Sequence, residues 1–178
     1  MIINGKHINL ISVTTDDAAF ILSLRLDANL GKYLSTVEND LQAQIEWINS
    51  YLHRERRGEE YYFVITEKSG ERLGTVRVYD FKGDSFSWGS WVMRPGNPSY
   101  AAIESALCVY EFAFAALGFA RCHFEVRKEN QKVIVFHTRF GATIVGEDDL
   151  NNYFELSKSD YLATRKKYVK YLTAEQLN

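Results

Sequence analysis

The sequence predicts a mixed α/β fold, of the α+β kind, in which helices flank a mostly antiparallel sheet. Two observations indicate it: strand-like runs are joined by short turns that contain glycine, and stretches with helical periodicity separate the groups of strands. Short turns join neighbouring strands in antiparallel order, whereas a doubly wound parallel sheet needs a helix after each strand. The 178 residues contain no linker, repeat or low-complexity tract, so we expect one domain over residues 1–178.

The first predicted elements are a strand and two helices. The strand covers residues 7–13, and Thr14 can cap a helix that begins with two aspartates and runs to about Leu26. An irregular stretch follows, and a capping signal at residues 39–42 begins the second helix. The apolar residues of this helix recur at helical spacing, at Leu41, Ile45, Ile48 and Leu52.

Three strand-like runs come next, and short turns join them into hairpins. Residues 60–66 are rich in Tyr, Phe, Val and Ile, and turns at Gly70 and Gly83 lead into residues 72–81 and 85–93. The later elements are a helix at 98–117 that Gly118 ends, a strand at 121–127, a helix at 130–139, a hairpin of residues 142–145 and 153–156, and a last helix from Ser157. This order fits helices packed on an antiparallel sheet.

Charge and cysteine content exclude several classes of protein. The net charge of −2 argues against an extended nucleic-acid surface, and the basic segments 54–57 and 165–170 are interrupted, so we interpret them as solvated helix faces. Cys108 and Cys122 stand in apolar patterns without metal-ligand spacing, so we expect buried free thiols, a reducing compartment and no metal site. Residues 1–10 lack a signal-peptide run, and no stretch approaches the roughly 20 apolar residues that cross a bilayer, so we expect a cytoplasmic protein.

One junction could bind a ligand with phosphate groups. Residues 91–102 form a predicted strand, a loop with glycine and proline, and the start of the long helix, for which Asn97 is a good N-cap and Pro98 suits the first turn. A helix N-terminus presents unpaired N–H groups and a partial positive charge. The small residues Ser99 and Ala101 would let a ligand approach the backbone. Many such junctions hold no ligand, and that alternative stays open.

The order of elements over residues 7–156 resembles the GNAT acyltransferases, particularly the branch that contains ribosomal-protein and amino-sugar N-acetyltransferases. In that family a diphosphate-binding loop opens the main helix with an Arg or Gln, followed by two small residues at fixed positions. Here Arg94 matches the first position, and Asn97 and Ser99 stand where the family has Gly and then Gly or Ala. The loop therefore keeps the Arg and departs at the other two positions.

A second motif, at residues 126–142, is the closer match. Asn130 precedes Gly141 by eleven residues, as the corresponding Asn and Gly do in the family. In the family this Asn lies where two strands part and helps to hold the pantetheine arm of the coenzyme. The resemblance implies a GNAT-like acyl-CoA N-acyltransferase fold, with acetyl-CoA held by Val92, Met93, Arg94, Asn97, Ser99, Tyr100, Ala101 and Asn130.

The resemblance also implies an activity, the transfer of an acetyl group from acetyl-CoA to a primary amine by direct attack in a ternary complex. The backbone of residues 92–93 would pair with pantetheine like an added strand, and a backbone N–H would stabilise the developing oxyanion. The acceptor could be an amino sugar, including a nucleotide-linked one, or a protein N-terminus, and the chain could form a homodimer. A catalytically inactive CoA- or metabolite-binding module and a structural domain without a CoA site are alternative interpretations.

His137 and Glu125 are the predicted catalytic residues. Family members often have a Tyr where this sequence has His137, proposed to protonate the departing thiolate, and an imidazolium could do the same. The alternative for His137 is packing within a helix. Glu125 could accept the proton of the amine, as could Asp80, His123 or a water relay, whereas a solvent-facing strand Glu is the commoner case.

The acceptor wall is predicted from aromatic and basic residues. Trp88 and Trp91 are three positions apart, so on a regular strand they point to opposite faces, and one of them could line an acceptor pocket rather than the core. The first two helices normally form the acceptor wall in the family, which brings in Arg25, Tyr33 and Ser35. Arg25 could hold an acidic or phosphate group of the acceptor, or could be an ordinary surface residue.

Overall fold

The computed structural model describes residues 1–177, and the domain end predicted at Asn178 lies outside them. Within that part of the chain, eight strands form one sheet in the order β1-β2-β3-β4-β5-β6-β8-β7. They are β1 (Ile2–Asn4), β2 (Ile8–Ser12), β3 (Tyr61–Glu67), β4 (Arg72–Lys82), β5 (Ser85–Met93), β6 (Arg121–Arg127), β7 (Thr143–Glu147) and β8 (Asn151–Ser157). Neighbouring strands are antiparallel except for β5 and β6, which confirms the predicted mostly antiparallel sheet.

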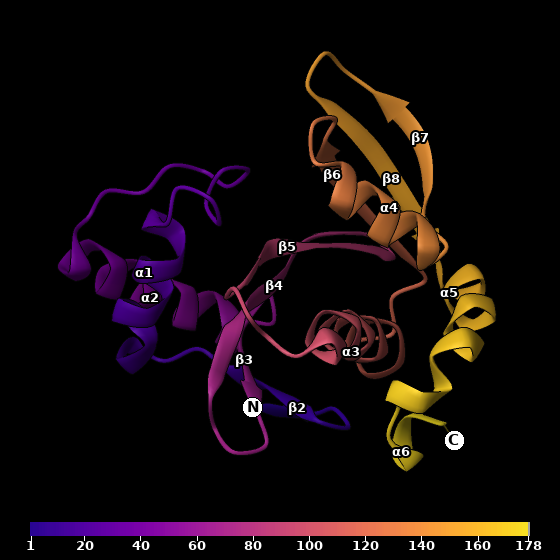
Figure 1. Ribbon diagram of the computed structural model, residues 1–178, viewed down its shortest axis with the longest axis horizontal. Coiled ribbons are helices and arrows are strands. Elements are labelled where there is room, and N and C mark those ends of the chain that lie inside the picture. The colour runs from indigo at the N-terminus through magenta and orange to yellow at the C-terminus, as the bar shows by residue number, and fades with distance from the viewer. Residues whose placement is uncertain (178) are drawn as a thin grey trace.

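Helices cover both faces of this sheet (Figure 1). One face carries η1 (Thr15–Asp17), α1 (Ala18–Leu26) and α2 (Leu41–Arg56). The other carries α3 (Ser99–Glu111) with the π-helical turn η2 (Phe112–Ala116), α4 (Gln131–Arg139), α5 (Lys158–Arg165), η3 (Lys166–Tyr171) and α6 (Ala174–Leu177). No helix in residues 1–177 has both the length and the hydropathy that crossing a membrane requires.

Two apolar cores form because the side chains of a strand alternate between the faces of the sheet. In β3, Phe63 and Ile65 join the core beneath α3, whereas Tyr62 and Val64 join a smaller core beneath α1 and α2. Tyr51 of α2 is fully buried, and its hydroxyl accepts from the N–H of Tyr62 and donates to the C=O of the same residue. These bonds tie α2 to the sheet, so the first two helices form a firm wall over β3 and β4.

The boundaries of a few elements differ from the predicted ones. Strand β1 was not predicted, because a three-residue edge strand is too short to show a periodic pattern. The long central helix begins at Ser99 and becomes π-helical at Phe112, before Gly118, with a φ of 79°, ends it as predicted. The last hairpin is longer than predicted, since β7 extends to Glu147 and β8 begins at Asn151.

A bulge in β5 changes the predicted arrangement of two tryptophans. The register between β4 and β5 shifts so that Val76 of β4 faces two residues, Ser90 and Trp91. Ser90 has a φ of 46°, in the left-handed region, which is typical of a strand that accommodates an extra residue. The extra residue returns Trp91 to the face that Trp88 occupies, and the two rings lie 5.4 Å apart. The prediction that they point to opposite faces is therefore wrong.

Both cysteines are free and buried, as predicted. Burial raises the pKa of the Cys108 thiol to about 12 and holds the pKa of Cys122 well above its ordinary value. Neither residue is a thiolate at neutral pH, so neither is a candidate nucleophile.

Candidate active site

Strands β5 and β6 separate after a short parallel contact. They pair at Ser85↔Arg121 and Phe86↔Cys122, and farther along β5 the edge that faces β6 has no neighbouring strand within residues 1–177. Figure 1 shows the two strands diverging, with β5 running across the molecule and β6 rising beside β8. Free N–H and C=O groups along such an edge are a template for an added strand.

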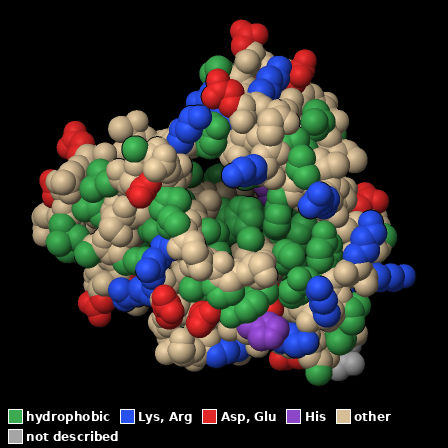
Figure 2. Space-filling model, in the orientation of Figure 1, with side chains coloured by type: hydrophobic (Ala, Val, Ile, Leu, Met, Phe, Trp, Pro, Cys, Tyr) green, Lys and Arg blue, Asp and Glu red, His purple; other side chains and the backbone are tan. Residues whose placement is uncertain are grey.

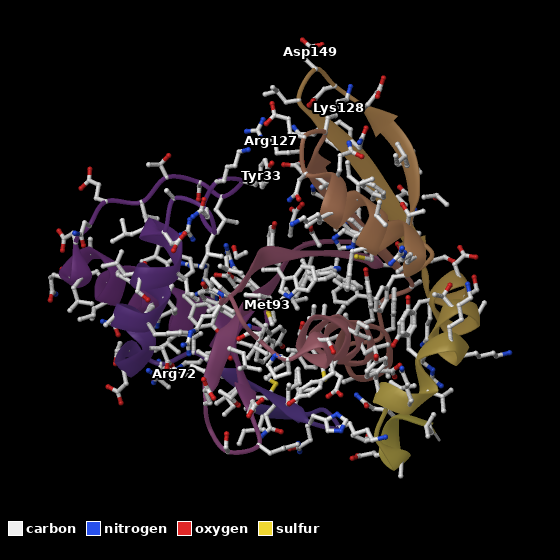
Figure 3. The ribbon with its side chains drawn as sticks, viewed as in Figure 1. Tyr33, Arg72, Met93, Arg127, Lys128 and Asp149 are labelled. Carbon is white, nitrogen blue, oxygen red and sulfur yellow. The ribbon has the colours of Figure 1, made fainter. Side chains whose placement is uncertain are left out.

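A hollow lies at this opening between the strands. Figure 2 shows a floor of hydrophobic side chains between two lobes, with Lys and Arg side chains along the rim. In Figure 3, Met93 of β5 lies near the centre, and Tyr33 and Arg127 reach over the opening from its two sides. Val92 and Met93 pair with β4 along the other edge of β5, so the backbone in the opening is held in place. The opening suits a long ligand that combines apolar segments with amide groups.

The N-terminus of α3 follows this edge of β5 after a short loop. Pro98 is the N-cap, and within the described chain no side chain caps the helix, which begins at Ser99. The prediction that Asn97 caps the helix is wrong, because its side-chain amide donates instead to the C=O of Leu73, at 2.7 Å. The N–H of Ala101 donates to the C=O of Pro98 at 3.0 Å, whereas those of Ser99 and Tyr100 stay available to an anion, and the helix dipole adds a partial positive charge there.

The side chains of the same loop already have protein partners. The guanidinium of Arg94 donates to the C=O of Arg72 at 2.9 Å, and the hydroxyl of Tyr100 donates to the carboxylate of Glu67 at 2.9 Å. Ala101 is fully buried. The backbone of β5 and α3 is thus better placed for a coenzyme than these side chains, whose roles as coenzyme contacts stay predictions.

Asn130 lies beyond the end of β6, where it is the N-cap of α4. Its N–H donates to the C=O of Arg127 at 2.8 Å, and its C=O accepts from Val133 and Ile134 at 3.1 Å. Within residues 1–177 its side chain makes no capping hydrogen bond. The backbone is therefore fixed while the amide is free, which the predicted contact with a pantetheine chain requires.

His137 is enclosed by aromatic rings. Its ring centroid lies 4.2 Å from that of Phe124 and 5.2 Å from that of Trp88, and the residue is 5% exposed. Burial lowers the pKa of His137 to about 3, so the imidazole is neutral near pH 7. The imidazolium that the sequence suggested as an acid does not form at that pH. These surroundings favour the packing alternative, although a neutral ring still has one N–H to donate.

The candidate bases differ in their surroundings. The carboxylate of Asp80 accepts a hydrogen bond from Lys82 at 2.7 Å and lies 3.1 Å from Nε2 of His123. Both contacts lower the pKa of Asp80, and the contact with Lys82 has the larger effect. His123 is held on its other side by the hydroxyl of Ser85, 2.7 Å from Nδ1. Glu125 is exposed on the face of β6 away from α3, and it forms no hydrogen bond or salt bridge with residues 1–177. Of these candidate bases, Glu125 is therefore the one whose side chain is not engaged by residues 1–177.

The predicted acceptor residues divide between two faces of the sheet. Nη2 of Arg25 donates to the C=O and the hydroxyl of Ser35, at 2.9 and 2.7 Å, so Arg25 orders the segment between α1 and α2 on which Tyr33 also lies. Trp88, in contrast, is 4% exposed beneath α3, and the half-buried Trp91 packs against the same core. The structure favours the core alternative for both tryptophans.

A cavity that was not predicted from the sequence lies on the face that carries α1 and α2. Its volume is about 300 Å³, and Trp47, Arg77 and Ser90 line it together with Arg25. It reaches β5 at the bulge, close to where the strands part. The pair Gly89-Ser90 inside a strand was a usable signal, because glycine there is typical of a bulge. Nothing in the local sequence marked Arg77.

Comparisons with known proteins agree with this geometry. A family model described as the acetyltransferase (GNAT) domain matches residues 7–143. The structure of apo FdhC, a nucleotide-linked sugar GNAT, is similar with a TM-score of 0.89 and 43% sequence identity, covering 97% of this chain and 99% of that chain. A search of curated proteins found no match.

Two further solved structures share the fold at low sequence identity. A GCN5-related N-acetyltransferase from Brucella melitensis has a TM-score of 0.76 and 19% identity, over 98% of this chain and 86% of that one. A spermidine N-acetyltransferase from Vibrio cholerae, in complex with CoA and spermine, has a TM-score of 0.74 and 17% identity, over 88% and 98%. These likenesses concern the fold alone, and they confirm the predicted mixed α/β architecture.

Proposed function

Because the chain belongs to the GNAT acetyltransferase family, we propose that it transfers an acetyl group from acetyl-CoA to the primary amine of a nucleotide-linked amino sugar. The observation that carries this proposal is the parting of β5 and β6 after Phe86 and Cys122, followed in the chain by the uncapped N-terminus of α3. The choice of acceptor is supported by 43% identity to a nucleotide-linked sugar GNAT. A protein N-terminus, the other acceptor that the sequence suggests, has no comparable support.

The residues of the opening fit a coenzyme that carries diphosphate and amide groups. The free edge of β5 offers N–H and C=O groups to amides, the first turn of α3 offers N–H groups to diphosphate oxygens, and Asn130 adds a donor and an acceptor. Acetyl-CoA bound there would supply the acetyl thioester. A backbone N–H of β5 would stabilise the negative charge that develops on the carbonyl oxygen.

The other task of the site is to take a proton from the amine. We assign this step to Glu125, directly or through a water, because its carboxylate is exposed on β6 and has no partner in residues 1–177. Glu125 would accept the proton as the amine nitrogen forms its bond to the acetyl carbon. The C–S bond of the thioester would then break, and the departing CoA thiolate would take a proton from water. Holding the two reactants together supplies much of the rate, so no covalent enzyme intermediate is needed.

Acetyl-transfer assays test the proposal directly. The purified protein with acetyl-CoA should release the thiol of CoA when a UDP- or TDP-linked amino sugar is the acceptor, and not with spermidine or a peptide N-terminus. Stabilisation by CoA without turnover of any amine would identify the inactive binding module, since a ligand at 100 times its Kd adds about 2.7 kcal/mol to the free energy of unfolding. A protein that does not bind CoA would overturn the proposal entirely.

Asn130→Ala is expected to weaken CoA binding about threefold to tenfold, through the loss of neutral hydrogen bonds to pantetheine. The variant should keep its stability, because the side chain makes no capping bond in the described chain. Calorimetric titration measures the Kd. Gln42→Ala, which removes an exposed amide from α2, is the control and should bind CoA as the parent does. An unchanged Kd for Asn130→Ala would count against this placement of the pantetheine chain.

A further inference from the structure

The cavity beside the bulge of β5 is positively charged. Its lining includes Arg25, Ser35, Trp47, Arg77 and Ser90, and we call it the Arg25–Arg77 pocket. It lies between α1, α2 and the face of the sheet opposite α3. Ser90 belongs to the bulge of β5. The pocket therefore extends to the part of β5 whose edge toward β6 has no paired strand in residues 1–177.

Arg77 is fixed in the pocket by a buried carboxylate and by aromatic rings. Glu60, 3% exposed, forms salt bridges with both Arg77 and Arg54. The guanidinium of Arg77 also lies 5.4 Å from the ring centroid of Trp47 and 4.8 Å from that of Tyr79. Two guanidinium groups share one carboxylate, so this cluster keeps an uncompensated positive charge.

Arg25 brings a second positive charge to the pocket. Its Nη2 is bound by the two oxygens of Ser35, which are neutral, and no carboxylate of residues 1–177 forms a salt bridge with it. Its Nε is buried and meets no acceptor in the described part of the chain. A buried guanidinium donor without a partner is costly, and a bound anion would remove that cost.

The charge and shape of the pocket indicate which anion it takes. Arg25 and Arg77 bring two positive charges to the lining, which, as far as residues 1–177 contribute to it, contains no Asp or Glu. Glu60 pairs with Arg77 from outside the lining and is shared with Arg54. The diphosphate of a nucleotide-linked sugar carries two negative charges, and the planar fork of Arg matches the geometry of phosphate oxygens. A ligand with a single carboxylate would match only one of the two guanidinium groups in the lining.

We propose that the Arg25–Arg77 pocket binds the diphosphate of the acceptor and thereby selects nucleotide-linked amino sugars over free ones. This inference rests on the proposed acetyl transfer and names the part of the acceptor that the site recognises. The pocket meets β5 at Ser90, next to Trp91 on the strand whose open edge would hold the coenzyme. An acceptor anchored there by its diphosphate would have its sugar directed toward the opening.

Steady-state kinetics with a nucleotide-linked amino sugar test the pocket. Arg25→Gln should raise the KM for the acceptor at least about tenfold and leave the KM for acetyl-CoA within about twofold, because a charged contact to phosphate is lost. Arg56→Gln is the matched control, since it removes the same charge from an exposed position on α2 outside the pocket, and its KM for the acceptor should stay within about twofold. An unchanged KM for the acceptor in Arg25→Gln would contradict the proposed role of the pocket in binding the diphosphate. It would leave the proposed acetyl transfer intact.

Direct binding separates the two proposals if the parent protein proves inactive. UDP, uridine and glucuronate are titrated in the presence of saturating CoA, so that any diphosphate site at the tip of α3 is already filled. UDP should bind the parent, bind Arg25→Gln at least about tenfold more weakly, and bind better than uridine or glucuronate. Equal binding of UDP and uridine, equal binding to the two proteins, or a preference for glucuronate would each contradict recognition of a diphosphate.

Discussion

Replacing Ser99 by Glu should weaken CoA binding about a hundredfold and leave the fold at least as stable as before. Ser99 is the first residue of α3, and within residues 1–177 no side chain caps this helix. A carboxylate in the first turn favours a helix by about 0.3–1 kcal/mol through the helix dipole. The same carboxylate, about 5 Å from a diphosphate oxygen, would repel it by about 3 kcal/mol at an effective dielectric constant of about 20, which is about a hundredfold in Kd.

Two further variants make this prediction specific. Ser99→Gln has the size of the Glu variant without its charge, so its Kd for CoA should stay close to that of the parent. Ser159→Glu places the same charge in the first turn of α5, where it should leave CoA binding unchanged. Calorimetric titration gives the Kd and thermal unfolding gives the stability. If Ser99→Glu binds CoA as tightly as the parent, the diphosphate does not lie at the tip of α3.

The order of helices and strands was predictable because its signals are local. Gly83 and Gly118 have φ values of 60° and 79°, and each stands where the sequence indicated a turn or a helix end. The alternation of apolar and polar residues in β6 likewise appears in the structure, where Cys122, Phe124 and Val126 are buried and Arg121, Glu125 and Arg127 are exposed. Each of these features depends on residues within a few positions of one another.

The side-chain contacts of the site could not be predicted in the same way, because they depend on residues far apart in the chain. Asn97 would cap α3 by its local sequence, but the C=O of Leu73 on β4 takes its amide. No local pattern around Arg77 indicates a pocket. Its guanidinium is fixed by Glu60, which immediately precedes β3, the strand paired with the strand of Arg77. The face to which Trp91 turns likewise depends on a bulge that only the pairing with β4 reveals.

The bulge and the parting of the strands together connect the two faces of the sheet. Trp91 packs against the core beneath α3, while its neighbour Ser90 lines the Arg25–Arg77 pocket on the face of α1 and α2. A thioester held along the free edge of β5 would therefore lie between the two faces. This explains how a coenzyme bound beside α3 and an acceptor bound beside α1 could meet without any movement of the sheet.

His137 should make the protein lose stability in mild acid. Burial lowers its pKa to about 3 in the folded protein, whereas an unfolded chain has a His pKa of about 6.5. Below about pH 6.5 the unfolded chain therefore takes up a proton on His137 that the folded chain does not. The contribution of His137 to stability is full above that pH and is lost as the pH falls from about 6.5 toward about 3. At about pH 5 the loss is on the order of 2 kcal/mol, or about 4–8 °C in Tm.

A His137→Phe variant separates this effect from the titration of carboxyl groups, which both proteins share. Between about pH 8 and about pH 5, the Tm of the parent should fall by about 4–8 °C more than that of His137→Phe, because only the parent excludes a proton from this ring. The Tm of His53→Gln, which removes an exposed His from α2, should fall by as much as that of the parent. Full turnover by His137→Phe would assign the residue to packing. Equal falls in the parent and His137→Phe would mean that the ring accepts a proton in the folded protein, and would restore the imidazolium as a candidate acid for the departing thiolate.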